Sequence, residues 1–185
     1  MAKVAIFIDG GYLTKVLQES FDSPKIDFAR LSVHLAGEDR ILRTYYYTCL
    51  PYRSIPPTQE EIDRYNNVQR FLNALRHLDR YEVREGKLAK RGTRADGRPD
   101  LQQKGVDILL ACDLILLSAK QRIDKAILIT GDGDFIPAIE IAKNNEGIEI
   151  ELVYDIGPHV NRGLIEIADV RRALTREDID AVRIE

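Results

Sequence analysis

The sequence predicts an α/β fold in three layers, with helices on both faces of a mostly parallel sheet of about five strands. Segments typical of strands alternate with segments typical of helices along the chain. The strand segments are short and almost continuously apolar, which is expected of parallel strands buried on both faces. The chain has 185 residues, the length of one domain, so we expect residues 1–185 to fold together.

The N-terminal part of the chain predicts two strands and two helices. Residues 3–8 form a short apolar run that ends at an Asp-Gly-Gly turn, which is typical of a buried strand. Apolar residues at helical spacing predict a helix over residues 12–19, and a further helix is expected over residues 27–35. Residues 40–50 are rich in Ile, Tyr and Thr and predict the second strand.

The middle of the chain predicts two more helices around a short strand. Thr58 and Glu61 have the spacing of a capping box at the start of an amphipathic helix. Residues 81–84 predict a short third strand, with an extension to residue 88 left open. Asp100 and Gln103 resemble a second capping pair, which would open a helix with a long apolar stripe.

The C-terminal part predicts the remaining strands and three helices. Residues 126–130 are apolar and predict the fourth strand, followed by a helix over residues 135–144. Residues 148–154 predict the fifth strand. Short helices are expected over residues 164–174 and 175–181.

Four carboxylates from distant parts of the chain are predicted to meet at one edge of this sheet. Asp9 follows the first strand, and Asp132 and Asp134 follow the fourth. Asp107 lies in the first turns of the helix that precedes the fourth strand, and this end of the helix lies at the carboxyl edge. Such sheets bind ligands beyond the carboxyl ends of their strands, so the four acids would share one cleft if the first and fourth strands are neighbours.

Clustered carboxylates repel each other and need protons or cations. A set of oxygen donors without Cys or His favours Mg²⁺ or Mn²⁺, and metals held in this way suit the hydrolysis of phosphodiesters. Each acid also has a structural explanation as a turn residue or helix cap. Lys104 would add a positive charge near the scissile phosphate, Thr130 would support the site from behind, and Asp113 would either hydrogen-bond beneath the site or serve as a structural acid.

The charge distribution indicates a surface for nucleic acid on a protein of net charge −3. Residues 84–104 carry seven basic and three acidic residues, or +4, and the rest of the chain has 20 basic and 27 acidic residues, or −7. A basic segment of this kind either guides a phosphate backbone or is a solvated loop. The residues expected to contact phosphates are Lys87, Lys90, Arg91, Arg94, Arg98 and Lys104.

Several other classes of protein are disfavoured. No apolar run is long enough to span a membrane, and the apolar stretch before Asp9 is too short for a signal peptide. Cys49 and Cys112 are isolated, which excludes a disulfide scaffold and favours the cytoplasm. No Gly-x-Gly-x-x-Gly fingerprint follows the first strand, and the Asp-Gly-Asp turn lacks the later residues of a calcium loop.

Three short motifs, in this order, resemble those of the NYN (LabA-like) domain in the PIN-like nuclease superfamily. They are Phe-Ile-Asp-Gly-Gly-Tyr at residues 7–12, Lys-Gly-Val-Asp at 104–107 and Leu-Ile-Thr-Gly-Asp-Gly-Asp-Phe-Ile-Pro at 128–137. The resemblance implies a Rossmann-like sandwich and metal-dependent ribonuclease activity at Asp9, Asp107, Asp132 and Asp134. Many members have Asn where this chain has Tyr12, which we expect to contact RNA in its place.

Three functions are compatible with these residues. The first is a metal-dependent endoribonuclease that cleaves RNA, either single-stranded or structured. The second is an RNA- or protein-binding regulator with a weak site. The third is a phosphatase of the haloacid dehalogenase type, although that class usually needs a second acid where this chain has Gly11. The sequence leaves open whether the chain forms a homodimer.

Overall fold

The computed structural model describes residues 1–93 and 99–184. In this part of the chain one sheet has the strand order β4-β3-β2-β1-β5-β6-β7, and all neighbours are parallel except β3 and β4. The sheet therefore has six parallel strands and one antiparallel strand, instead of about five. The strands are β1 (Lys3–Asp9), β2 (Arg40–Cys49), β3 (Tyr81–Thr93), β4 (Pro99–Lys104), β5 (Lys125–Ile129), β6 (Glu149–Tyr154) and β7 (Val170–Ala173).

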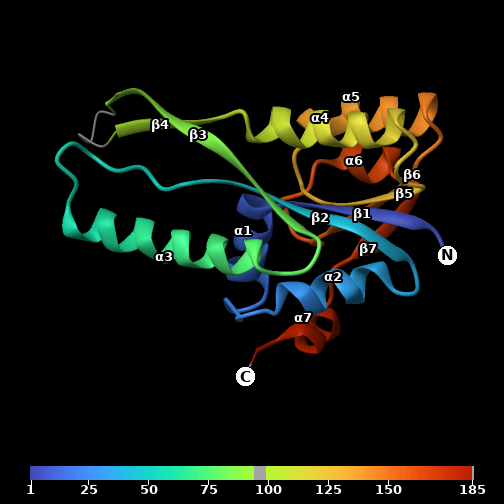
Figure 1. Ribbon diagram of the computed structural model, residues 1–185, viewed down its shortest axis with the longest axis horizontal. Coiled ribbons are helices and arrows are strands. Elements are labelled where there is room, and N and C mark those ends of the chain that lie inside the picture. The colour runs from blue at the N-terminus through green and yellow to red at the C-terminus, as the bar shows by residue number, and fades with distance from the viewer. Residues whose placement is uncertain (94–98, 185) are drawn as a thin grey trace.

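Helices cover both faces of the sheet, which confirms the three-layer prediction (Figure 1). One face is covered by α1 (Gly10–Ser20), α2 (Phe28–Ala36), α3 (Gln59–Arg76) and α7 (Arg176–Val182). The other face is covered by α4 (Val106–Ala119), α5 (Ile136–Glu140) and α6 (Arg162–Ile167). A 3₁₀ turn, η1 (Gly133–Phe135), precedes α5, and a π-helical turn, η2 (Ile141–Asn145), follows it. No helix among the described residues is long and apolar enough to cross a bilayer.

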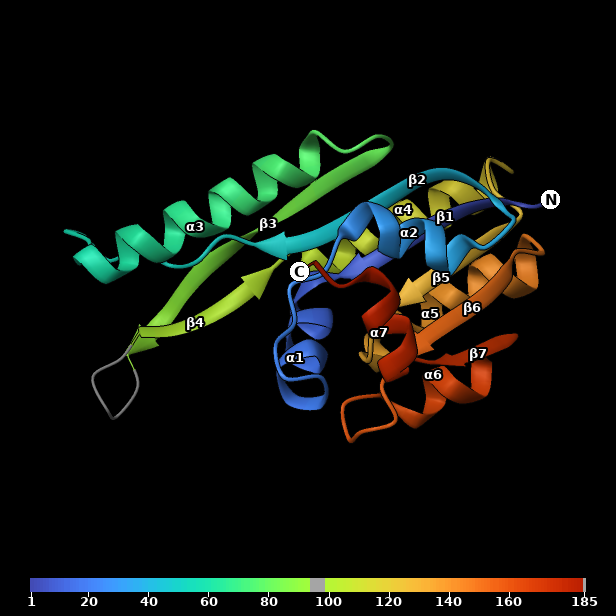
Figure 2. The ribbon, with the colours of Figure 1, turned by 90° about the horizontal axis from the view of Figure 1, so that it is seen from below.

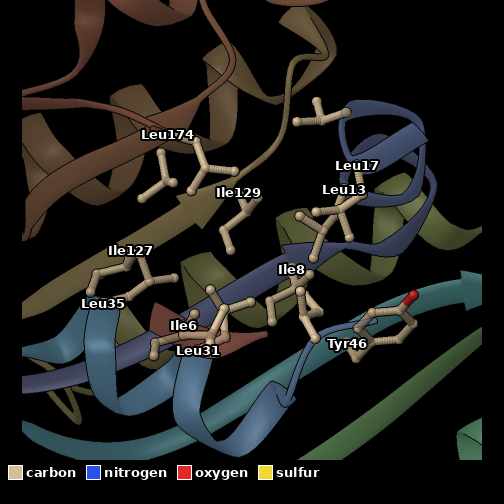
Figure 3. Packing of buried hydrophobic residues seen from close by; sticks show 14 of the residues in the cluster. Ile6, Ile8, Leu13, Leu17, Leu31, Leu35, Tyr46, Ile127, Ile129 and Leu174 are labelled. Carbon is tan, nitrogen blue, oxygen red and sulfur yellow. The ribbon is translucent and has the colours of Figure 1, made fainter. Parts of the chain in front are cut away.

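The two hydrophobic cores follow from the alternation of side chains along β1. Ile6 and Ile8 point to the first face, where Figure 3 shows them packed with Leu13 of α1 and Leu31 of α2. Phe7 points to the opposite face, toward α4 and α5. All five side chains are almost completely buried, and burial of apolar surface contributes roughly 25 cal/mol per Å². Because both faces of β1 are buried, its sequence is continuously apolar.

The strand order changes direction at β1. From β1 the chain builds the sheet outward through β2 and β3 on one side, and through β5, β6 and β7 on the other. Ile8 of β1 pairs with Ile129 of β5, so the residues that follow these two strands lie side by side. The first and fourth predicted strands are thus neighbours, which meets the condition for a shared cleft, and the sheet is open for a ligand at their carboxyl ends.

The basic segment is not a loop in its described part. It forms a hairpin in which Lys87 of β3 pairs with Lys104 of β4. β3 continues well beyond Gly86, the last residue that pairs with β2, and β4 satisfies the backbone groups that would otherwise be unpaired. Together with α3, the hairpin forms an arm that extends beyond the rest of the sheet (Figure 2).

Two sequence predictions of helices were wrong. Asp100 and Gln103 do not cap a helix but lie in β4, and α4 begins only after Gly105, whose φ of 88° suits glycine. The segment 164–174 is divided between α6 and β7. β7 is a four-residue edge strand in which Val170 and Arg171 are exposed and Arg172 is only partly buried, and so it lacks the apolar pattern of a buried strand.

The C-terminal helix is fixed to α2 by a polar cluster. Asp178 of α7 lies 2.6 Å from the His34 ring and accepts a 3.0 Å hydrogen bond from Arg172 of β7. Partial burial raises the pKa of Asp178, but hydrogen bonds from His34, Thr175 and Arg172 outweigh it and hold the pKa well below the usual range. The ionised carboxylate therefore joins two helices and a strand.

Candidate metal and nuclease site

Asp9 links the end of β1 to the start of α1. As the N-cap of α1, its carboxylate accepts a 3.1 Å hydrogen bond from the backbone N–H of Tyr12, and its other oxygen accepts a 3.3 Å bond from the Thr130 hydroxyl. Burial raises the pKa of Asp9, these hydrogen bonds oppose that effect, and the nearby charge of Asp107 raises the pKa further. Asp9 is thus a partly buried carboxyl group whose ionised form is stabilised by Tyr12 and Thr130 and destabilised by the charge of Asp107.

Thr130 connects Asp9 to the second group of acids. It follows β5, is completely buried, and its hydroxyl oxygen also accepts a 3.3 Å hydrogen bond from the backbone N–H of Asp132. The Asp132 side chain in turn accepts a 2.9 Å bond from the Asp134 N–H and caps the 3₁₀ turn η1. Asp132 and Asp134 are both exposed. Thr130 thus contacts two of the acids, and its supporting role in a metal site stays a prediction.

Asp107 reaches the same edge from α4. It is the second residue of that helix and is exposed. Its pKa is raised, first by partial desolvation and then by the charges of Asp132 and Asp134. Asp107 also contributes to the raised pKa of Asp9. The structure therefore brings the predicted acids within electrostatic reach of one another, although they are far apart in the sequence.

The residues present suit a hard divalent cation. Within the described residues, no three His, Cys, Asp or Glu side chains are already grouped tightly enough to enclose an ion. The chemistry of the donors nevertheless fits, because the four acids offer only oxygen atoms, and repulsion between like charges adds to the effect of burial in raising the pKa of Asp9 and of Asp107. A cation between Asp9, Asp107, Asp132 and Asp134 would remove that repulsion.

The loop after β6 packs against the turn that carries Asp132. A Cβ atom on Gly131 would lie 2.0 Å from the carbonyl oxygen of His159, so only glycine fits. Asn161 donates its backbone N–H to the Gly131 carbonyl at 2.9 Å, and its side chain lies against Gly133. Asn161 was not among the residues predicted for the site, although its loop follows the fifth predicted strand at the same edge of the sheet.

Tyr12 has a structural partner in this loop. Its hydroxyl oxygen accepts a 3.0 Å hydrogen bond from the backbone N–H of Asp155, and its ring lies against Gly131. The buried Asp155 carboxylate accepts a 2.8 Å bond from Ser20. Tyr12 thus links α1 to the loop after β6 through a hydrogen bond, and the sequence did not indicate this contact. Its contact with RNA stays a prediction.

Asp113 lies in a different polar cluster on α4. Its carboxylate accepts hydrogen bonds of 3.0 Å from the Tyr47 hydroxyl and from Nε of Arg84. The side chain thus faces β2 and β3, and Asp9 is not among the partners found for it. Of the two roles predicted for Asp113, these contacts favour that of a structural acid.

The predicted phosphate contacts fall on the β3–β4 hairpin. Lys87 is exposed on β3. Lys90 and Arg91 follow on the same strand and Lys104 ends β4, but their side chains lie outside the described part of the structure. The whole of Arg94 and Arg98 lies outside the described residues.

Comparison with known proteins identifies the family. An uncharacterized protein, y4oD of Sinorhizobium fredii (strain NBRC 101917 / NGR234), is 34% identical over 84 residues, which are 45% of this chain and 37% of that protein. The chain therefore aligns with little more than a third of that relative. A crystal structure of a protein of unknown function, VPA0982 from Vibrio parahaemolyticus RIMD 2210633, superimposes with a TM-score of 0.67 over 99% of this chain and 96% of that one. Their identity is 19%, so this likeness shows the fold alone.

The family match extends over both parts of the acidic site. The sequence matches the NYN domain from residue 3 to residue 174, which includes all four acids. The chain therefore belongs to the NYN domain family, which is grouped with the PIN-like nucleases.

Proposed function

We propose that this NYN domain is a metal-dependent endoribonuclease whose reaction centre is formed by Asp9, Asp107, Asp132 and Asp134. The observation that carries the proposal is the electrostatic coupling of these acids at the switch in strand order. Membership of a nuclease-like family supports the hydrolytic part of the proposal. The basic hairpin, whose strand β4 ends three residues before Asp107, supports a polyanionic substrate.

The residues have different tasks in this proposal. Asp9 is held from two sides, by the N–H of Tyr12 and the hydroxyl of Thr130, and would provide the fixed ligand. Asp107 and Asp132 are exposed and would hold the cation toward the substrate. When bound, Mg²⁺ or Mn²⁺ would contact phosphate oxygens, stabilise the developing negative charge and lower the pKa of the attacking water. Thr130 would position two of the acids through its two hydrogen bonds.

Replacing Asp132 tests the proposal. The Asp132→Asn variant keeps an oxygen that can cap η1, but it loses one negative charge. It should melt at a higher temperature than wild type in chelator and gain less from millimolar Mn²⁺, because only the folded state binds the ion. Cleavage of RNA should fall by more than about 100-fold, since loss of even an outer partner of a metal site costs about 10–100-fold.

A matched control is Asp22→Asn, an exposed position that lies beyond the far end of α1 from Asp9 and is paired with Arg176. Asp22 has a φ of 61°, which Asn tolerates, so this variant should behave as wild type toward Mn²⁺ and RNA. If Asp132→Asn has the melting curves of wild type and still cleaves RNA, Asp132 is only a cap. Cleavage of p-nitrophenyl phosphate but not of RNA would instead indicate a phosphatase.

A further inference from the structure

A hollow lies beside the arm that α3 and the β3–β4 hairpin form; the arm itself is seen in Figure 2. This hollow of about 720 Å³ separates the loop after β2 from the start of the arm. Its lining includes Tyr52 and Arg53 of the loop, Tyr65 of α3 and Lys87 of β3. None of the four acids of the proposed metal site lines this hollow.

A stacked pair of side chains forms one wall of the hollow. The guanidinium carbon of Arg53 lies 3.8 Å from the centre of the Tyr65 ring. Arg53 is exposed and lines the hollow, so the face of its guanidinium that points away from Tyr65 is accessible. Proteins that bind single-stranded RNA stack unpaired bases on aromatic rings and on arginine planes of this kind.

The charge of the hollow favours a phosphate-bearing ligand. Among the described residues that line it, Arg53 and Lys87 are charged and both are basic, and no carboxylate is present. The acid Glu61 contacts this loop, where it accepts hydrogen bonds from the backbone N–H groups of Ser54 and Thr58 at 3.1 and 2.9 Å. Glu61 therefore orders the loop that carries Arg53 before any ligand arrives.

A second hollow has lining residues that adjoin both the proposed metal site and the larger hollow. This smaller hollow of about 300 Å³ between α1 and α3 is lined by Gly10 and Gly11, which directly follow Asp9, and by Cys49 at the end of β2. The next residue, Leu50, lines the larger hollow. Tyr47 of β2 pairs with Asp9, and Leu50 follows Tyr47 by three residues. At the usual strand rise of about 3.3 Å per residue, the larger hollow therefore begins roughly 10 Å further along the chain than the level of Asp9.

We propose that the hollow between the β2–α3 loop and the arm binds an unpaired nucleotide of the RNA strand that is cleaved at the acids. The base stacks on Arg53, which Tyr65 supports from behind, and Lys87 contacts the adjacent phosphate. The RNA substrate rests on the proposed function, but the subsite is defined by this loop and arm alone. A double-stranded RNA would not fit, because its bases are already stacked and paired.

Binding of a fluorescein-labelled oligouridine to the full chain tests the subsite separately from catalysis. Fluorescence anisotropy is measured in chelator, where no metal-dependent cleavage occurs. Arg53→Ala and Tyr65→Ala should each weaken binding by about tenfold, within the range known for loss of one stacked base. Tyr65→Phe should bind as wild type, because the ring face is retained. The matched control is Arg64→Ala, which removes an exposed charge next to Tyr65 that does not line the hollow.

A second substrate keeps the two proposals distinguishable. Bis-p-nitrophenyl phosphate is too small to reach the hollow from the acids, so Arg53→Ala should hydrolyse it with Mn²⁺ at the wild-type rate. If wild type hydrolyses neither this diester nor RNA, the nuclease proposal fails while the anisotropy still reports on the hollow. Equal binding of oligouridine by wild type, Arg53→Ala and Tyr65→Ala overturns the subsite, as does wild-type binding of a duplex RNA that is as tight as that of oligouridine. Melting curves identify any variant whose loss comes from unfolding.

Discussion

The Thr130→Val variant isolates the hydroxyl group that joins the two halves of the acidic site. Valine has nearly the same shape as threonine, but it can neither donate to Asp9 nor accept from the N–H of Asp132. A hydrogen bond to a charged group contributes about 1.5–3 kcal/mol, and we expect about 1–2 kcal/mol here because both bonds are 3.3 Å long. In a domain of this size that loss lowers the melting temperature by about 2–8 °C.

The loss should depend on pH in a defined direction. The Thr130 hydroxyl stabilises the ionised form of Asp9, so its removal raises the pKa of Asp9 further above the ordinary value. The stability difference between wild type and Thr130→Val is therefore complete where Asp9 is ionised in both proteins. It shrinks as the pH falls and Asp9 takes up a proton.

The assay is a series of melting curves in chelator between acidic and neutral pH, with Thr130→Ser as the control. Serine keeps the hydroxyl and loses one methyl group, which costs about 1 kcal/mol at every pH. If the Val and Ser variants lose the same stability with the same pH dependence, the hydroxyl does not support Asp9, and the coupling inferred for this site is wrong.

Three further outcomes follow from the same structure. Asp178→Asn should cost about 1–3 kcal/mol at neutral pH through its lost hydrogen bonds. Because the folded pKa of Asp178 is lowered, the difference should begin to shrink as the pH falls below about 4 and be lost only when the folded carboxylate itself takes up a proton; chemical denaturation at several pH values measures this. Gly131→Ala should destabilise the fold by about 1–3 kcal/mol and reduce RNA cleavage, because the new Cβ would overlap the carbonyl oxygen of His159 in the facing loop. Unchanged melting and cleavage would contradict this close packing of the two loops. Replacing Lys87 and Arg91 together with Ala should reduce the salt dependence of RNA binding by about 0.7 units of slope per lost phosphate contact, and an unchanged slope would make the hairpin an ordinary solvated surface.

Much of the fold could be predicted because its signals are local. The apolar runs before Asp9 and before Thr130 are the sequence of strands buried on both faces, and parallel strands bring their carboxyl ends to one edge. The capping box at Thr58 and Glu61 was read from two residues and is confirmed with both of its hydrogen bonds. The order of strands and helices therefore sufficed to predict four acids at one edge, but a shared cleft also required β1 and β5 to be neighbours, which the structure decided.

Other features depend on contacts that no local pattern records. The residues of β3 and β4 include charges and glycines typical of a loop, yet they form a hairpin. β3 extends beyond the end of its parallel partner β2, so the backbone groups of its second half need another strand as hydrogen-bond partner, and β4 provides it. The β7 strand was predicted as helix because an exposed edge strand has no apolar alternation. In both cases the pairing of distant backbone groups outweighed the local pattern.

The sequence by itself determined the two buried strands, their Asp-containing turns and the oxygen-only character of the candidate site. Only the tertiary structure decided what each polar group contacts. Thr130 reaches Asp9 across 121 positions of the chain, and the Tyr12 hydroxyl accepts from Asp155 across 143. The Asp113 carboxylate accepts a hydrogen bond from Arg84 of β3 and faces β2 and β3. A side chain's type and spacing fix what it can bind, but which partner is within hydrogen-bond distance depends on how the layers pack.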